Sequence, residues 1–163
     1  MKQKLPLAAL LIAPYVLLAG GIALLLHGKP WMILVLWALI VLLAFLPAMV
    51  CALLLPRRGW PARRLLFWNM VLKLCNIPFY IGVFFAGMMM SVFVIPLLPF
   101  LALFDYSVLL PSTMYGLSGL LQARREGRIR TKTLLVHGVM QFFFCLDVFS
   151  AICLYVNARK WEV

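Results

Sequence analysis

Long apolar runs that carry no charge constrain this chain most strongly. Residues 5–26 and 31–55 contain no Lys, Arg, Asp or Glu, and each run exceeds the roughly 20 residues that a helix needs to cross a bilayer. Of the 163 residues, 66% are apolar, whereas a soluble domain has about 45–50%. One small core cannot bury this excess. The sequence therefore predicts that lipid is the solvent for much of the chain.

Basic clusters between these runs divide the chain into predicted spans. The stretch 65–122 would be about 87 Å long as one helix, so we expect it to cross twice and to turn at Pro96 and Pro99. A turn near Gly87 is the alternative, which gives four spans plus a surface or re-entrant helix within 65–122. The prediction is an all-α bundle that forms a single membrane domain, 1–163, with spans at about 5–26, 31–55, 65–95, 96–122 and 133–157.

The distribution of Lys and Arg predicts the orientation. With the N-terminus inside, the inner segments hold eleven basic residues and the outer segments hold three, namely Lys29, Arg159 and Lys160. The positive-inside rule then favours N-in and C-out, in the cytoplasmic membrane of a bacterium. Clustering between apolar runs argues against nucleic acid as a partner. Anionic lipid headgroups are the predicted partners of the loop arginines, which are Arg57, Arg58, Arg63, Arg64, Arg124, Arg125, Arg128 and Arg130.

Four polar side chains within the spans are candidates for a proton or ion pathway. They are Lys73 and Asn76 on the third span, Asp105 on the fourth and Asp147 on the fifth. Intramembrane ionisable groups are costly, so they are functional candidates by default. The two carboxyls are expected at similar depth, where they could share protons. The alternative is that these groups only bond across helix interfaces, with Lys73 extending toward the inner surface.

Small residues in the same spans predict close helix packing. Ser112, Gly116 and Gly119 continue the helix face that begins at Asp105. The second span carries a ridge of small side chains, namely Ala44, Ala48 and Ala52. Such residues let membrane helices approach closely, within one chain or between copies. We therefore expect a homo-oligomer or a partner membrane protein.

The string Gly116-Leu117-Ser118-Gly119 resembles the nucleophile motif of rhomboid proteases. That resemblance implies a Ser118 nucleophile activated by a histidine from another helix, which here would be His137. It covers four residues only. The chain has five predicted spans, fewer than the six of the rhomboid core, and its second span lacks His and Asn. A Ser118–His137 hydrolase is therefore the third interpretation.

The predicted function is transport by a small transporter, channel or transporter subunit. The first alternative is a non-catalytic accessory or assembly protein, in which the polar and small faces only bind helices. No enzyme activity, cofactor or metal is predicted. The four cysteines form no Cys-x-x-Cys pair and are interpreted as apolar filler.

Overall fold

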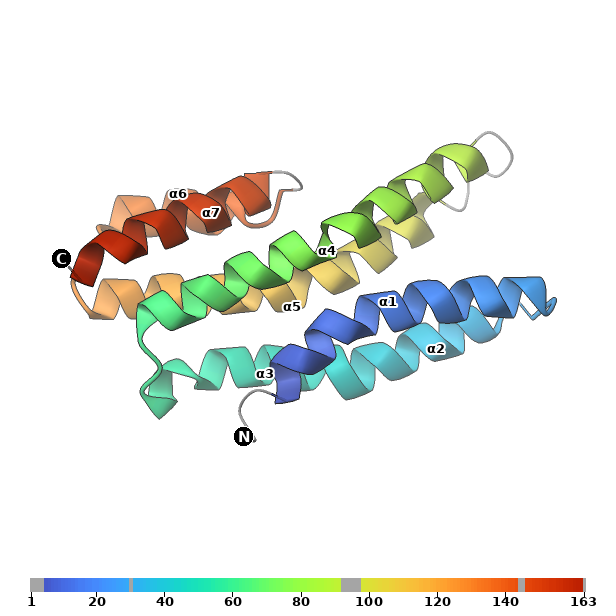
Figure 1. Ribbon diagram of the computed structural model, residues 1–163, viewed down its shortest axis with the longest axis horizontal. Coiled ribbons are helices and arrows are strands. Elements are labelled where there is room, and N and C mark those ends of the chain that lie inside the picture. The colour runs from blue at the N-terminus through green and yellow to red at the C-terminus, as the bar shows by residue number, and fades with distance from the viewer. Residues whose placement is uncertain (1–4, 30, 92–97, 144–145, 163) are drawn as a thin grey trace. The chain divides into compact units, whose positions relative to one another are not determined.

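Helices make up every regular element in the computed structural model, which describes residues 5–29, 31–91, 98–143 and 146–162 (Figure 1). The all-helical prediction is confirmed for these residues. Within these described ranges, three helical stretches are long and apolar enough to cross a membrane, namely Pro6–Leu26, Met32–Leu54 and Ala62–Phe85. The predicted turn at Pro96 lies outside the described residues, whereas Pro99 lies in a helix.

The first two predicted spans are each one helical run. α1 covers Leu5–Leu26, and the second run consists of α2 (Met32–Ile40), a π-helical turn η1 (Val41–Phe45) and α3 (Leu46–Leu54). The π turn has a local cause in Pro47, which has no N–H to bond the carbonyl one turn earlier and whose ring crowds that carbonyl. The helix widens there, and the Leu46 N–H bonds the Val41 carbonyl instead.

The basic loop after α3 leads into two long helices. The short 3₁₀ helix η2 (Pro56–Arg58) ends at Gly59, whose positive φ of 78° suits glycine. α4 then covers Ala62–Ser91 and α5 covers Leu98–Arg125, in place of the predicted 65–95 and 96–122. At 28 residues, α5 is about 42 Å long, which exceeds the apolar thickness of a bilayer.

The fifth predicted span is not one helix. The structure divides 133–157 between α6 (Thr131–Met140) and α7 (Leu146–Arg159), followed by the 3₁₀ helix η4 (Lys160–Glu162). These helices are about 15 Å and 21 Å long, so each is shorter than the roughly 30 Å apolar core of a bilayer. Asp147 lies in the first turn of α7, where the helix dipole favours a carboxylate and so favours a new helix start.

The chain forms two compact units. Unit 1 contains 1–48 and 75–108, and unit 2 contains 49–74 and 109–163. In unit 1, the Trp37 indole donates a hydrogen bond to the Ser107 hydroxyl at 3.1 Å and packs edge-on against Phe104. Gly20 lies so close to Leu36 that an added Cβ would stand 2.7 Å from that side chain. These contacts pack α1 against α2, and α2 against the start of α5.

Unit 2 is built around a hydrophobic cluster at the ends of four helices. Its buried members, Leu66, Leu120, Leu154 and Ala158, come from the start of α4, the end of α5 and the end of α7. Leu134, near the start of α6, packs against the same cluster. The start of α6 and the end of α7 therefore lie together, so α6 and α7 form a hairpin. The single helix predicted over 133–157 would instead have placed its two ends far apart.

Glu126 links the two basic loops of unit 2 by a hydrogen bond. Its Oε1 accepts a hydrogen bond from the Ala62 N–H at 3.1 Å and another from the Gln122 amide at 3.0 Å. Ala62 is the first residue of α4, so the carboxylate caps the helix end at which negative charge is favoured. A residue of one loop thus fixes the helix that leaves the other.

Candidate functional site

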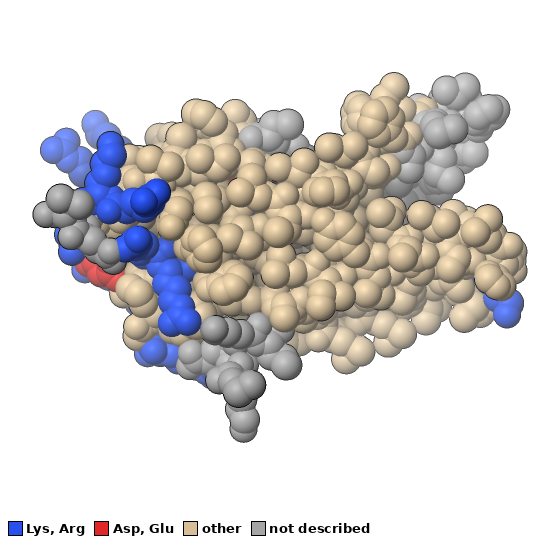
Figure 2. Space-filling view, viewed as in Figure 1, with Lys and Arg blue, Asp and Glu red and all other residues tan. Residues whose placement is uncertain are grey.

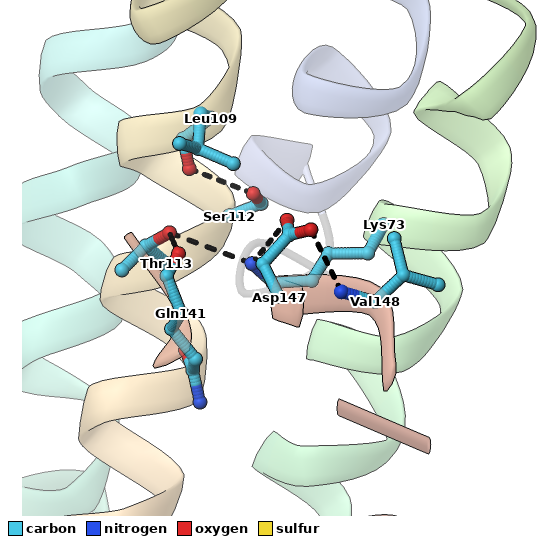
Figure 3. A network of polar contacts seen from close by, with 7 residues as sticks. All are labelled: Lys73, Leu109, Ser112, Thr113, Gln141, Asp147 and Val148. Atoms are coloured by element: carbon cyan, nitrogen blue, oxygen red, sulfur yellow. Dashed lines mark hydrogen bonds and ion pairs between the residues drawn. The ribbon is translucent and has the colours of Figure 1, made fainter. Parts of the chain in front are cut away.

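A buried ion pair between Lys73 and Asp147 is the centre of the candidate site (Figure 3). Lys73 Nζ lies 2.8 Å from Asp147 Oδ2, and the two side chains are 0% and 2% exposed. Lys73 comes from the middle of α4, and Asp147 comes from the first turn of α7. The pair therefore joins the hairpin to a long helix at the point where the hairpin turns.

A threonine on α5 connects the ion pair to the end of α6. Lys73 Nζ lies 3.5 Å from Thr113 Oγ1, and that hydroxyl donates to the Gln141 carbonyl at 3.0 Å. Asp147 Oδ1 also accepts from the Val148 N–H at 2.7 Å. Figure 3 shows Lys73, Thr113, Gln141 and Asp147 converging, and they come from α4, α5, the C-cap of α6 and the first turn of α7. Four helices thus supply one polar network in unit 2.

Lys73 and Asp147 compensate each other's charge, and neither charge could be buried alone. Removing one ion from water costs several kcal/mol, and a close partner of opposite sign recovers much of that cost. The carboxylate gains further stabilisation at the positive end of the α7 dipole. The Lys73 ammonium has less support, because its other contact is the Thr113 hydroxyl at the limit of hydrogen-bond distance. The network is therefore neutral as a whole and depends on both members.

Further buried polar atoms in unit 2 have no hydrogen-bond partner among the described residues. They belong to Asn69, Tyr115, Ser118 and the side-chain amide of Gln141. Asn69 precedes Lys73 by one helical turn, so the two lie on the same face of α4. Buried polar groups are satisfied in most proteins. The interior of unit 2 therefore offers hydrogen-bonding capacity that the described protein groups leave unused.

The structure brings together two of the four predicted pathway residues. Lys73 and Asp147 form the ion pair, which the sequence did not predict as a pair. Asn76 lies one turn beyond Lys73 on the same face of α4, within unit 1. Asp105 also belongs to unit 1, and its buried Oδ1 has no partner among the described residues. The sharing of protons between Asp105 and Asp147 stays a prediction, because the two residues belong to different units.

Sequence reasoning missed Thr113, Gln141 and Asn69. Asn69 had a usable signal, since it lies four residues before Lys73 on a helix. Gln141 had none, because a continuous span over 133–157 placed it on an ordinary helix face. The break between α6 and α7 instead brings its carbonyl to Thr113.

The hydrogen bond between Ser118 and His137 that the hydrolase interpretation requires does not form. His137 Nδ1 lies 2.8 Å from Ser150 Oγ, so its partner is a serine of α7 within the hairpin. Ser118 Oγ is buried and has no hydrogen-bond partner among the described residues. A nucleophilic serine needs a base within hydrogen-bond reach. In this structure His137 joins the two helices of the hairpin and does not reach Ser118.

The predicted packing residues lie against the chain's own side chains. A Cβ on Gly119 would stand 2.8 Å from Leu66, and a Cβ on Gly116 would overlap the Gln141 amide. Ser112 is buried and donates to the Leu109 carbonyl at 2.8 Å. Ala48 and Ala52 are fully buried, and Ala44 is half-buried. Gly116, Gly119, Ser112, Ala48 and Ala52 are therefore enclosed by contacts within one chain.

Positive charge gathers at one end of unit 2, where α4 begins and α5 and α7 end (Figure 2). Arg64 stacks over the Trp60 ring there, at 4.2 Å from the ring centroid. The basic residues of this end are Arg57, Arg58, Arg63, Arg64, Arg124, Arg125, Arg128, Arg130, Lys132, Arg159 and Lys160. Arg159 and Lys160 join the loops because the hairpin returns the chain to them.

Over the residues that the structure describes, these features define an all-helical protein with three helices apolar enough to cross a membrane and an ion pair buried between helices. The chain belongs to a family of unknown function, DUF6652, whose match covers residues 4–160. Comparisons with curated proteins and with solved structures give no match.

Proposed function

We propose that the chain is a polytopic membrane protein with four crossings and a C-terminal hairpin that enters and leaves on the cytoplasmic side. The contact between the start of α6 and the end of α7 supports this arrangement. It also improves the charge asymmetry, because thirteen of the 15 Lys and Arg residues then lie inside. Only Lys29 lies outside, and Lys73 is in the ion pair.

Cysteine labelling tests this topology. Arg58→Cys and Lys160→Cys should react with a membrane-impermeant maleimide from the same side, in inside-out vesicles only. The unsubstituted chain controls for labelling of Cys51, Cys75 and Cys153, which are free thiols. If the two cysteines react from opposite sides of the membrane, the chain has a single fifth span and no hairpin.

Within this topology, we propose that the protein functions in proton-coupled transport, as a small transporter or as the membrane subunit of one. The observation that carries the proposal is the buried Lys73–Asp147 pair at the turn of a broken helical segment. Non-helical backbone at membrane depth is tolerated where it is buried in protein or lines a polar cavity, and transporters bind their ions at such breaks. Intramembrane ion pairs likewise mark ion and proton pathways.

The chemistry follows from the arrangement of the pair. Proton binding to Asp147 removes its negative charge and weakens its attraction to Lys73. The hairpin is then held to α4 and α5 by neutral hydrogen bonds, such as that from Thr113 to Gln141. Unpartnered polar atoms of Asn69 and Gln141 can take up the hydrogen bonds of water or of an entering ion. Protonation would thus favour a second position of the hairpin.

Proton flux in proteoliposomes tests the proposal. Vesicles that enclose a pH-sensitive dye should acidify under a potassium-valinomycin potential with the wild-type chain, faster than protein-free vesicles. The double variant Lys73→Met/Asp147→Val should lose this flux while its helix content is unchanged. Ser118→Ala is the matched control and should keep the flux, and Asp105→Asn shows whether the unit 1 carboxyl shares the pathway.

Two results would refute the transport proposal. One is a wild-type rate equal to that of empty vesicles, and the other is full flux in the double variant. Either result would leave the ion pair as a structural tie for the hairpin. That outcome favours the non-catalytic accessory or assembly function, in which the protein acts by binding another membrane protein.

A further inference from the structure

A basic cavity lies where the start of α6 meets the end of α7 in unit 2. Its volume is about 380 Å³. Its walls are Arg128, Ile129, Arg130, Thr133, Leu154, Asn157, Lys160 and Trp161. Three of these residues are cationic and none is acidic. No ion pair of these three cations is present among the side chains that the structure describes.

The lining of this cavity is amphiphilic. Arg128, Arg130 and Lys160 are exposed at the rim, whereas Leu154 is buried and belongs to the hydrophobic cluster of unit 2. Ile129 and Trp161 pack against the same cluster. A ligand that fits must therefore place negative charge at the rim and apolar groups against the floor.

Backbone and polar side chains add donors for an anion. The N-cap of α6 is Arg130, which makes no side-chain capping hydrogen bond, so the first N–H groups of α6 have no cap from it. Thr133 and Asn157 supply a hydroxyl and an amide. The carboxyl end of α7 brings partial negative charge to the same place, and Arg159 and Lys160 offset it. The lining side chains themselves carry three positive charges.

We propose that this cavity binds the phosphate of an anionic phospholipid headgroup, with the glycerol and upper acyl chain against Leu154 and Trp161. Arginine pairs two N–H donors with phosphate oxygens, and basic pockets between helices on the cytoplasmic side bind such headgroups. The inference rests on the proposed membrane topology, which places this end at the inner surface, and it does not depend on transport. The proposal is that lipid binds at one defined site, in addition to the general attraction of a basic surface to anionic lipid.

Lipid titration of the full chain in detergent tests the site. Short-chain phosphatidylglycerol should bind, with quenching or enhancement of tryptophan fluorescence, and phosphatidylcholine should not. Arg128→Gln/Arg130→Gln/Lys160→Gln should weaken the tightest site by at least about tenfold, given about 1 kcal/mol for each basic residue near an anionic lipid. The matched control removes the same charge outside the cavity through Arg57→Gln/Arg58→Gln/Arg125→Gln, and it should change that affinity less than about threefold.

Competition distinguishes a lipid from a free anion. Inorganic phosphate or glycerol phosphate should compete only at concentrations far above that of the lipid, because neither contacts the apolar floor. Equal affinity for inorganic phosphate would overturn the lipid assignment. An equal loss of lipid affinity in the two triple variants, or no loss in either, would refute the proposed site. Intact lipid binding with no proton flux would refute the transport proposal alone.

Discussion

A double-mutant cycle at Lys73 and Asp147 measures how much of the stability of unit 2 depends on the buried pair. Removing one member of a buried ion pair leaves an uncompensated charge and costs about 3–5 kcal/mol. Asp147→Val should lie at the upper end of this range, because Lys73 Nζ then keeps only the Thr113 hydroxyl, at 3.5 Å, as a hydrogen-bond contact among the described residues.

Lys73→Met should cost less than Asp147→Val. In this variant the Asp147 carboxylate loses its ion-pair partner but still accepts the hydrogen bond from the Val148 N–H at 2.7 Å. It also remains in the first turn of α7, and a helix N-terminus stabilises a negative charge by about 0.3–1 kcal/mol. The double variant removes both charges, and an apolar pair in place of an ion pair is often neutral or stabilising. We therefore expect its free energy of unfolding to lie within about 1 kcal/mol of the wild type.

The assay is unfolding in mixed micelles by titration with a denaturing detergent, followed by tryptophan fluorescence and by helix content. Trp60 and Trp68 lie in unit 2 and report on it. Additive single effects, with a coupling energy below about 0.5 kcal/mol, would refute the reasoning, since independent sites add within that limit. Equal costs for the two single variants would refute the contribution assigned to the α7 N-terminus.

Three further perturbations test other contacts of unit 2. Glu126→Ala should cost about 0.5–2 kcal/mol, because it removes the acceptor for the Ala62 N–H; the same micelle titration measures this, and an unchanged midpoint would contradict the capping role. Gly116→Ala should lower the free energy of unfolding by about 1–3 kcal/mol, because the added methyl group overlaps the Gln141 amide. Adding Gln141→Ala to the same chain should restore most of this stability. A loss that persists in the double variant would exclude the clash as its cause. Ser118→Ala should be neutral or stabilising, because the buried hydroxyl has no partner among the described residues; a loss above about 1 kcal/mol would show a contact that this structure does not contain.

The sequence by itself determined the first two helical runs and which loops are basic. Runs such as 5–26 and 31–55 have no charged residue, so their backbone must bond internally wherever water is absent. Observed α1 covers Leu5–Leu26, and the second run covers 32–54, close to these limits. Lys73 and Asp147 were identifiable as functional candidates because ionisable groups are rare in such runs.

Only the tertiary structure decided that Lys73 and Asp147 lie in contact. The segment 133–157 is apolar throughout most of its length, and hydropathy does not distinguish one long helix from two short ones separated by a turn. Helix breaks of this kind depend on partners elsewhere in the chain, here Thr113 for the Gln141 carbonyl and Lys73 for Asp147. The pairing of Lys73 with Asp147, the return of Arg159 and Lys160 to the basic loops and the cavity beside them all follow from that break. Each is a contact between residues distant in the chain, and a one-dimensional pattern of hydropathy and charge carries no information on such contacts.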